Sequence, residues 1–111
     1  MNDKYERQMK KGVLDMLVLK LLETEPKYGY QLIHEMMEKS GDIFLLKEGT
    51  LYPILYRLEE ESWIEGQWSE AKGKQVPRKY YRITDKGKDA LASIGKVWKQ
   101  IQKGVAQIME E

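Results

Sequence analysis

The sequence predicts a mainly α-helical fold with a small β-hairpin. Three segments with helical spacing of apolar residues fill positions 13–62, two strand-like segments around a polar loop fill positions 63–84, and one long heptad pattern follows. Three short helices followed by a hairpin is the element order of a winged helix-turn-helix. We therefore expect a winged helix-turn-helix domain over residues 1–84 and one long C-terminal helix over residues 85–111.

The first two helices are indicated by their apolar residues and by the residues at their ends. Residues 13–22 are apolar on nearly every side, which favours a buried helix packed on more than one side. It ends before Glu25 and Pro26, because the residue preceding a proline avoids the helical region. Apolar i, i+4 pairs predict the second helix over residues 30–39, and Gly41 is a suitable C′ residue after it.

The third predicted helix runs from Gly49 to Ser62. Pro53 lies near its start, and a proline is tolerated in a first turn because its missing N–H has no intrahelical acceptor there. Apolar residues spaced i, i+4, i+7 predict one buried stripe. This stripe consists of Leu51, Leu55 and Leu58.

Two strand-like segments come after the helices. Residues 63–69 alternate between apolar and polar, and residues 79–84 are rich in tyrosine. The intervening residues 70–77 are polar and contain a glycine, so we expect a two-stranded hairpin with a basic loop, the wing. A hairpin of this size needs helices behind it to be stable.

The last helix is predicted to start at Thr84, a good N-cap residue, and no proline interrupts it. Its apolar residues are spaced 3, 4, 3, 4, 3, which is a heptad seam: Leu91, Ile94, Trp98, Ile101, Val105 and Ile108. A helix of some 26 residues reaches ~39 Å, longer than a domain of this size can cover. We therefore expect the seam to pair with a second copy of the chain in a homodimer.

The charge distribution is uneven although the net charge is only +1, from 19 Lys and Arg against 18 Asp and Glu. Residues 72–82 carry five basic side chains and no acidic one, whereas acidic residues predominate over 23–65. A basic hairpin tip can follow DNA phosphates into a groove. The alternative is a solvated surface loop.

The start of the third helix is the part of it suited to a polyanion. Lys47, Thr50 and Tyr52 lie there, where backbone N–H groups and the helix dipole favour phosphate, and Tyr56 lies one turn further on. The glutamates at 59–61 would repel DNA, so we expect only the N-terminal half to enter a groove. Alternatively, Tyr52 or Tyr56 is partly buried against the wing.

Several function classes are disfavoured by composition. The chain has no cysteine, which excludes disulfides and thiolate metal sites or nucleophiles. His34 is the only histidine, and we find no phosphate-binding glycine loop or metal-ligand cluster, so we expect no catalytic residues, no metal, no cofactor and no enzyme activity. The chain has no apolar run long enough for a membrane span and no signal-peptide pattern, which predicts a soluble cytoplasmic protein without a membrane partner.

Three motifs together resemble the PadR family of bacterial transcriptional regulators. They are the YGY motif at 28–30, the GTLYPILYRLE motif at 49–59 and the RKYYRITDKG motif at 78–87. The resemblance covers roughly residues 12–87 and implies a homodimeric winged-helix repressor that binds a pseudo-palindromic double-stranded DNA operator. The operator contacts that it implies are Tyr28, Gln31, Thr50, Tyr52, Lys72, Lys74, Arg78 and Lys79.

The single C-terminal helix resembles that of the short, LmrR-like PadR regulators, some of which bind flat aromatic compounds between paired tryptophans. Trp98 lies eleven residues after Gly87, where those members carry that tryptophan. The resemblance thus implies an aromatic effector site at Trp98, with Ile94 and Ile101 beside it. Two indoles at a two-fold axis could equally pack on each other. Lysines but no carboxylate surround Trp98, so a preference for cationic drugs does not transfer.

One further alternative stays open, a winged helix that contacts only other proteins. The basic wing argues against this alternative. Binding to operator DNA would separate the two functions.

Overall fold

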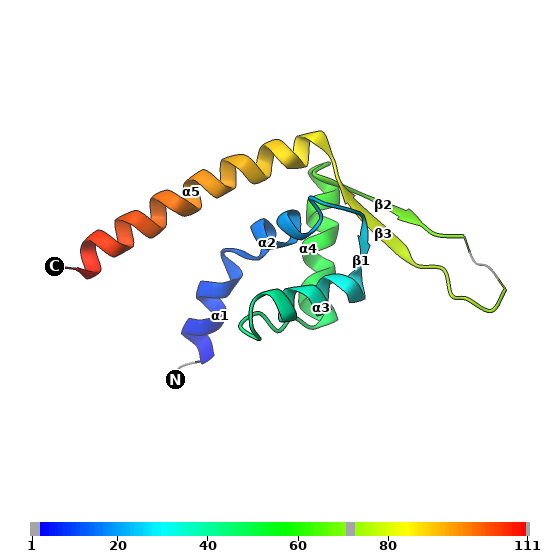
Figure 1. Ribbon diagram of the computed structural model, residues 1–111, viewed down its shortest axis with the longest axis horizontal. Coiled ribbons are helices and arrows are strands. Elements are labelled where there is room, and N and C mark those ends of the chain that lie inside the picture. The colour runs from blue at the N-terminus through cyan, green and yellow to red at the C-terminus, as the bar shows by residue number, and fades with distance from the viewer. Residues whose placement is uncertain (1–2, 71–72, 111) are drawn as a thin grey trace.

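The structure is a computed structural model that describes residues 3–70 and 73–110, and it has the predicted winged helix-turn-helix with a long C-terminal helix (Figure 1). Its helices are α1 (Asp3–Lys11), α2 (Leu14–Leu21), α3 (Gly29–Lys39), α4 (Glu48–Glu60) and α5 (Asp85–Met109). Its strands are β1 (Lys27–Tyr28), β2 (Ile64–Trp68) and β3 (Lys79–Ile83). The molecule measures 62 × 33 × 21 Å, because the C-terminal part of α5 and the hairpin tip project in opposite directions from the helical body (Figure 1).

Two elements were not predicted. Helix α1 buries none of its residues and presents Tyr5 and Met9 to solvent. Strand β1 pairs antiparallel with β3, so the sheet has three strands in the order β1-β3-β2 instead of the two of a simple hairpin. A strand of two residues has no periodicity that a sequence could reveal, and only the packing of α3 brings it beside β3.

The core lies between α2, α3, α4 and the inner face of the sheet. Helix α2 packs against α3, α4 and α5, as expected for a helix that is apolar on nearly every side. The predicted stripe of α4 is buried, and strands β2 and β3 each contribute the residues of one face to the core. The buried core residues are Leu14, Val18, Leu19, Leu22, Leu32, Met36, Leu51, Ile54, Leu55, Leu58, Ile64, Tyr81 and Ile83.

Helix α3 ends in a Schellman motif, as the glycine after it predicts. Gly41 has φ +60°, and its N–H donates to the carbonyl of Glu38 at 3.2 Å. The N–H of Asp42 donates to the carbonyl of Met37 at 3.0 Å. These bonds satisfy two carbonyls that would otherwise lack partners at the helix end.

The position of Pro53 in α4 differs from the prediction. The helix begins at Glu48, so the proline lies in its second turn and not in the first. A proline there cannot donate to the carbonyl of Gly49 four residues earlier. Gly49 is exposed, so water can bond to this carbonyl at the surface.

Thr84 caps α5 as predicted. Its hydroxyl accepts a hydrogen bond from the N–H of Gly87 at 3.0 Å and donates to the carbonyl of Ser62 at 2.7 Å. The first part of α5 packs on the core through Leu91 and Ile94. The remaining seam residues are exposed in the single chain, as are their apolar neighbours Val97 and Met109. The exposed large apolar residues of α5 are Val97, Trp98, Ile101, Val105, Ile108 and Met109.

Candidate nucleic-acid interface

A hollow of about 280 Å³ lies between the N-terminus of α3, helix α4 and the hairpin. We call it the wing hollow. Its lining residues are Tyr28, Gly29, Tyr52, Tyr56, Trp68, Pro77, Arg78, Lys79 and Tyr81. The hollow therefore brings together five of the predicted DNA-binding residues, from three separate segments of the chain.

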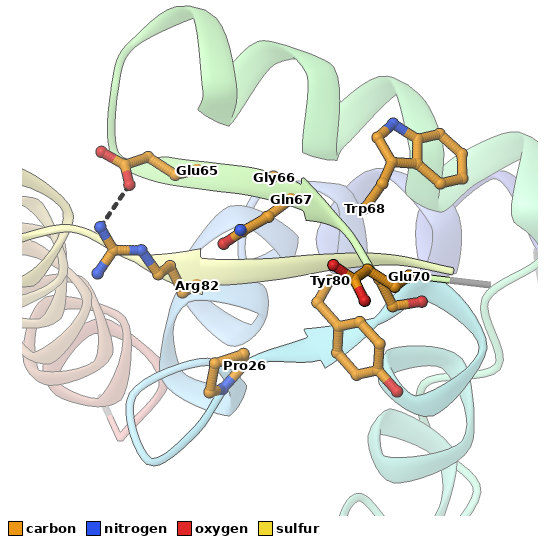
Figure 2. A pocket seen from close by; sticks show the side chains of 9 residues that line it. Pro26, Glu65, Gly66, Gln67, Trp68, Glu70, Tyr80 and Arg82 are labelled. Carbon is orange, nitrogen blue, oxygen red and sulfur yellow. Dashed lines mark hydrogen bonds and ion pairs between the residues drawn. The ribbon is translucent and has the colours of Figure 1, made fainter. Parts of the chain in front are cut away.

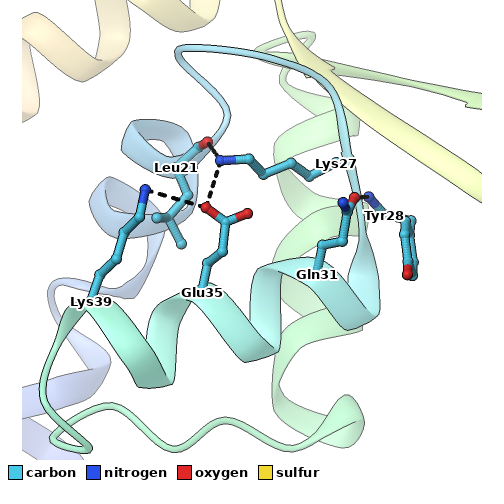
Figure 3. A network of polar contacts seen from close by, with 6 residues as sticks. All are labelled: Leu21, Lys27, Tyr28, Gln31, Glu35 and Lys39. Carbon is cyan, nitrogen blue, oxygen red and sulfur yellow. Dashed lines mark hydrogen bonds and ion pairs between the residues drawn. The ribbon is translucent and has the colours of Figure 1, made fainter.

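Tyr28 is held between two side chains of the hairpin. Its ring meets the ring of Tyr80 edge to face, with centroids 5.4 Å apart, and the guanidinium of Arg78 lies 4.5 Å from its centroid. Such a cation–π contact orients a guanidinium without neutralising it. The side-chain oxygen of Gln31 accepts a hydrogen bond from the N–H of Tyr28 at 3.1 Å, at the start of α3 (Figure 3).

A buried lysine fixes β1 and thereby the start of α3. The ammonium of Lys27 donates to the carbonyl of Leu21 at 2.7 Å and to the carboxylate of Glu35 at 2.9 Å, and Lys39 approaches the same carboxylate at 3.2 Å (Figure 3). Burial raises the pKa of Glu35, but the hydrogen bonds and charges of the two lysines outweigh it, so its pKa is lowered. Lys27 is only 2% exposed, and no sequence pattern distinguished it from a surface lysine.

The two tyrosines of α4 differ in their surroundings. Tyr52 packs over the N-terminus of α3: a Cβ added to Gly29 would lie 2.6 Å from the hydroxyl of Tyr52. This close fit explains why a glycine follows Tyr28. Tyr56 is 56% exposed, and its ring centroid is 6.3 Å from that of Tyr52. The alternative of partial burial thus describes Tyr52, whereas Tyr56 faces solvent.

Two basic side chains of the wing are paired within the protein. Lys79 donates to Glu59 of α4 at 3.1 Å, and Arg82 donates to Glu65 of β2 at 2.6 Å on the other face of the sheet (Figure 2). Arg78 and Lys74 have no acidic partner among the described residues. The cationic surface of the wing is therefore smaller than the count of basic residues suggested, and Lys72 lies outside the described residues.

Lys47 and Thr50 do not line the wing hollow. Both are exposed at the start of α4 and line a wider groove of about 760 Å³ that α1 borders on its other side. Lys47 occupies the N-cap position of α4 and makes no capping hydrogen bond with its side chain. The predicted contacts on α4 thus divide between two faces of the helix.

Trp68 is a candidate site residue that the sequence reasoning missed. It pairs with Lys79 across the hairpin, lines the wing hollow and is 64% exposed. It lies on the same face as buried Ile64, and Figure 2 shows its indole on the opposite side of the hairpin from Tyr80. Trp68 is the last apolar residue of an alternating strand and lies beyond the core. This position in the sequence could have predicted an exposed tryptophan.

The histidine and the acidic side chains of the described residues do not form a metal-binding cluster. His34 is on the outside of α3, with its ring 3.5 Å from Glu38. Within residues 3–70 and 73–110, no three His, Cys, Asp or Glu side chains gather as metal ligands would. In the same ranges, no helix has the length and apolar character required to span a membrane.

Comparison with known proteins decides the family. The family model for PadR-like transcriptional regulators matches residues 18–93, which run from the second half of α2 through β1, α3, α4 and the hairpin to the start of α5. The chain belongs to the PadR family. Regulators of this family are non-enzymatic, bind DNA and are typically dimeric. The PadR assignment agrees with the three motifs, and it makes the protein a transcriptional regulator.

Three individual PadR proteins resemble the chain with similar sequence identities. It is 30% identical over 79 residues to the negative transcriptional regulator PadR of Bacillus subtilis, a match that covers 71% of this chain and 43% of that protein. A PadR family regulator from Eggerthella lenta is 32% identical with a TM-score of 0.86, covering 97% of this chain and 91% of that one. A PadR-like regulator from Bacillus cereus is 34% identical with a TM-score of 0.78, covering 94% and 98%.

Proposed function

We propose that this PadR regulator is a homodimeric repressor that binds a pseudo-palindromic DNA operator through α3, α4 and the wing. The observation that carries the proposal is the wing hollow, in which the unneutralised guanidinium of Arg78 lies over the ring of Tyr28 and which the exposed Tyr56 also lines. Arginine and tyrosine are common donors to phosphate and base edges. The proposed direct contacts are Tyr28, Gln31, Lys47, Thr50, Tyr52, Tyr56, Lys72, Lys74 and Arg78.

The distribution of charge supports specific rather than general attraction to DNA. Lys79 and Arg82 are neutralised by glutamates, so few free cations remain on the part of the wing that the structure describes. Non-specific affinity should accordingly be modest, and two half-sites bound by one dimer must supply much of the binding energy.

The test of DNA binding is selection of duplexes from a random-sequence library by the wild-type protein, followed by fluorescence anisotropy. Enrichment of an inverted repeat supports the proposal. Failure to enrich any sequence, with a folded protein, would overturn it and favour the winged helix that contacts only proteins.

Arg78→Ala should weaken binding to the selected duplex by about tenfold or more, because each protomer loses an oriented charge. The plot of log affinity against log salt should become shallower by about two for the dimer if both guanidiniums contact phosphate. Arg82→Ala is the matched control, since Arg82 is paired with Glu65 on the other face, and it should change affinity little. Equal losses of DNA affinity in the two variants would show that Arg78 is not a specific DNA contact.

The proposed dimer is formed through α5, with Leu91 and Ile94 at the base of the seam. Trp98 is 37% exposed, Ile101 52%, Val105 54% and Ile108 70% in the single chain, which is unusual for an apolar seam without a partner.

Ile101→Asp should raise the dissociation constant of the dimer by about 100-fold or more, because a two-fold interface buries the new charge twice. Sedimentation equilibrium measures this change. Gln100→Asp adds the same charge one residue outside the seam and should leave the dimer intact. A dimer that persists in Ile101→Asp places the interface elsewhere.

An aromatic effector site at Trp98, with Ile94 and Ile101, is the finer part of the proposal. Lys96, Lys99 and Lys103 surround it, which favours neutral or anionic planar compounds over cationic ones. In a Trp63→Phe, Trp68→Phe background, neutral acridone should quench Trp98 fluorescence more strongly than cationic proflavine. It should also weaken DNA binding by the wild-type protein, which retains Trp68. Absence of quenching by both dyes would make Trp98 a packing residue.

A further inference from the structure

Lys79 lies where a phosphate contact was predicted, but its ammonium is turned toward the protein. The ammonium is 3.1 Å from Glu59 of α4 and 5.2 Å from the ring centroid of buried Tyr81. The side chains of Lys79 and Glu59 are 25% and 27% exposed, so the ion pair is shielded from water on most sides. This shielding distinguishes it from the pair of Arg82 and Glu65, whose side chains are 61% and 57% exposed.

Gly66 makes the reach of Lys79 to α4 sterically allowed. It lies on the same face of the hairpin as Trp68 and Lys79, two register pairs closer to the core. A Cβ on Gly66 would lie 2.3 Å from Cε of Lys79 and 3.1 Å from Oε2 of Glu59. The lysine stem therefore crosses the space that any other residue at this position would fill.

This bridge joins the two parts of the DNA-binding surface. Glu59 belongs to α4, and Lys79 is the first residue of β3 and directly follows Arg78. Fixing Lys79 limits how far the base of the wing can swing from α4, and so limits where the guanidinium of Arg78 can lie relative to Tyr28.

We propose that Lys79, Glu59 and Gly66 form a clamp that sets the position of the wing against α4, and that Lys79 is a positioning residue and not a phosphate contact. The inference rests on the proposed DNA binding. In this arrangement Glu59 promotes DNA binding although its charge repels DNA.

The test compares Lys79→Met, Glu59→Gln and Gly66→Ala on the duplex selected by the wild-type protein. A clamp predicts that all three weaken binding by about fivefold to tenfold, since a shielded ion pair contributes more than an exposed one. If Glu59 only repelled DNA, Glu59→Gln would instead strengthen DNA binding. The matched control is Glu60→Gln, which removes the same charge from the exposed neighbouring residue and should leave binding equal or tighter.

Salt dependence separates positioning from phosphate contact. In the clamp, Lys79→Met lowers affinity while the slope of log affinity against log salt stays within experimental error of the wild type. A phosphate contact predicts a slope shallower by about two for the dimer. The reversed pair, Glu59→Lys with Lys79→Glu, restores the bridge and should recover most of the affinity lost in either single reversal, which a phosphate contact would not.

The outcomes are distinct from those of the proposed function. If the wild-type protein selects no duplex, DNA binding itself fails. If it selects one, a shallower slope for Lys79→Met, tighter binding by Glu59→Gln or no rescue by the reversed pair would each overturn the clamp. Urea unfolding of each variant shows whether the fold is retained. The nearest atoms that the new methyl group of Gly66→Ala meets are the flexible ends of the Lys79 and Glu59 side chains.

Discussion

Gly87→Ala should destabilise the protein by about 3 kcal/mol, the largest effect we expect from a single methyl group. Gly87 is buried in the first turn of α5. A Cβ there would lie 2.0 Å from the carbonyl oxygen of Trp63 and 2.8 Å from Cγ1 of Ile83. The carbonyl belongs to the backbone and also accepts a hydrogen bond from the N–H of Thr84 at 3.0 Å, so it cannot move aside without losing that bond.

The first turn of α5 must therefore separate from the hairpin in this variant. Urea unfolding at a fixed protein concentration measures the loss, because the stability of a dimer depends on concentration. Gly95→Ala is the matched control, since nothing lies within 4 Å of a Cβ at that position of the same helix. It should be neutral or stabilise the helix by up to about 1 kcal/mol. Equal midpoints for Gly87→Ala and the wild type would show that α5 does not dock this closely.

Lys27→Met should cost about 2–3 kcal/mol, although it exchanges a charged residue for an apolar one of similar length. The change leaves the carbonyl of Leu21 without its donor and leaves Glu35 with only Lys39. Loss of the Lys27 partner is costly because Glu35, whose side chain is 23% exposed, stays largely desolvated. Lys39→Met removes a lysine from the same carboxylate, but that lysine is 64% exposed and should cost less than about 1 kcal/mol.

The stabilisation by Lys27 should also depend on pH. The pKa of Glu35 is lowered from its ordinary value of 4.5 in the folded protein, so its contribution is fully present above that value and is lost as the pH falls through the lower, folded pKa. The difference in unfolding free energy between the wild type and Lys27→Met should be constant at neutral pH and should narrow in acid below about pH 4.5. A difference that does not change down to pH 3 would contradict the role of Glu35.

Much of the fold could be predicted because it is encoded locally. Helical spacing revealed α2, α3 and α4, and single residues marked boundaries: Gly41 ended α3 and Thr84 started α5. These features depend on neighbours within one or two turns. Helix α1 and strand β1 escaped prediction because α1 has only two large apolar residues, Tyr5 and Met9, and β1 is only two residues long.

The site was predicted less completely, because whether a side chain is free to contact DNA depends on which residues of other elements pack against it. The sequence indicated a basic wing and a tyrosine-rich α4, and the structure places Tyr28, Tyr52, Tyr56 and Arg78 around one hollow. It places Lys47 and Thr50 on another groove. Residues that are close in sequence can therefore lie on different surfaces when helical rotation separates them.

The sequence by itself determined the helical periods, the caps, the alternating strand and the heptad seam, since these depend on spacing along one chain. Tertiary structure alone decided which charges are neutralised and which apolar residues stay uncovered. Lys79 meets a glutamate 20 residues earlier and Lys27 one 8 residues later, and in neither pair do the two residues belong to the same helix or strand. Such partners are set by how whole elements pack, which is why two lysines that look alike in the sequence became a clamp and a buried support.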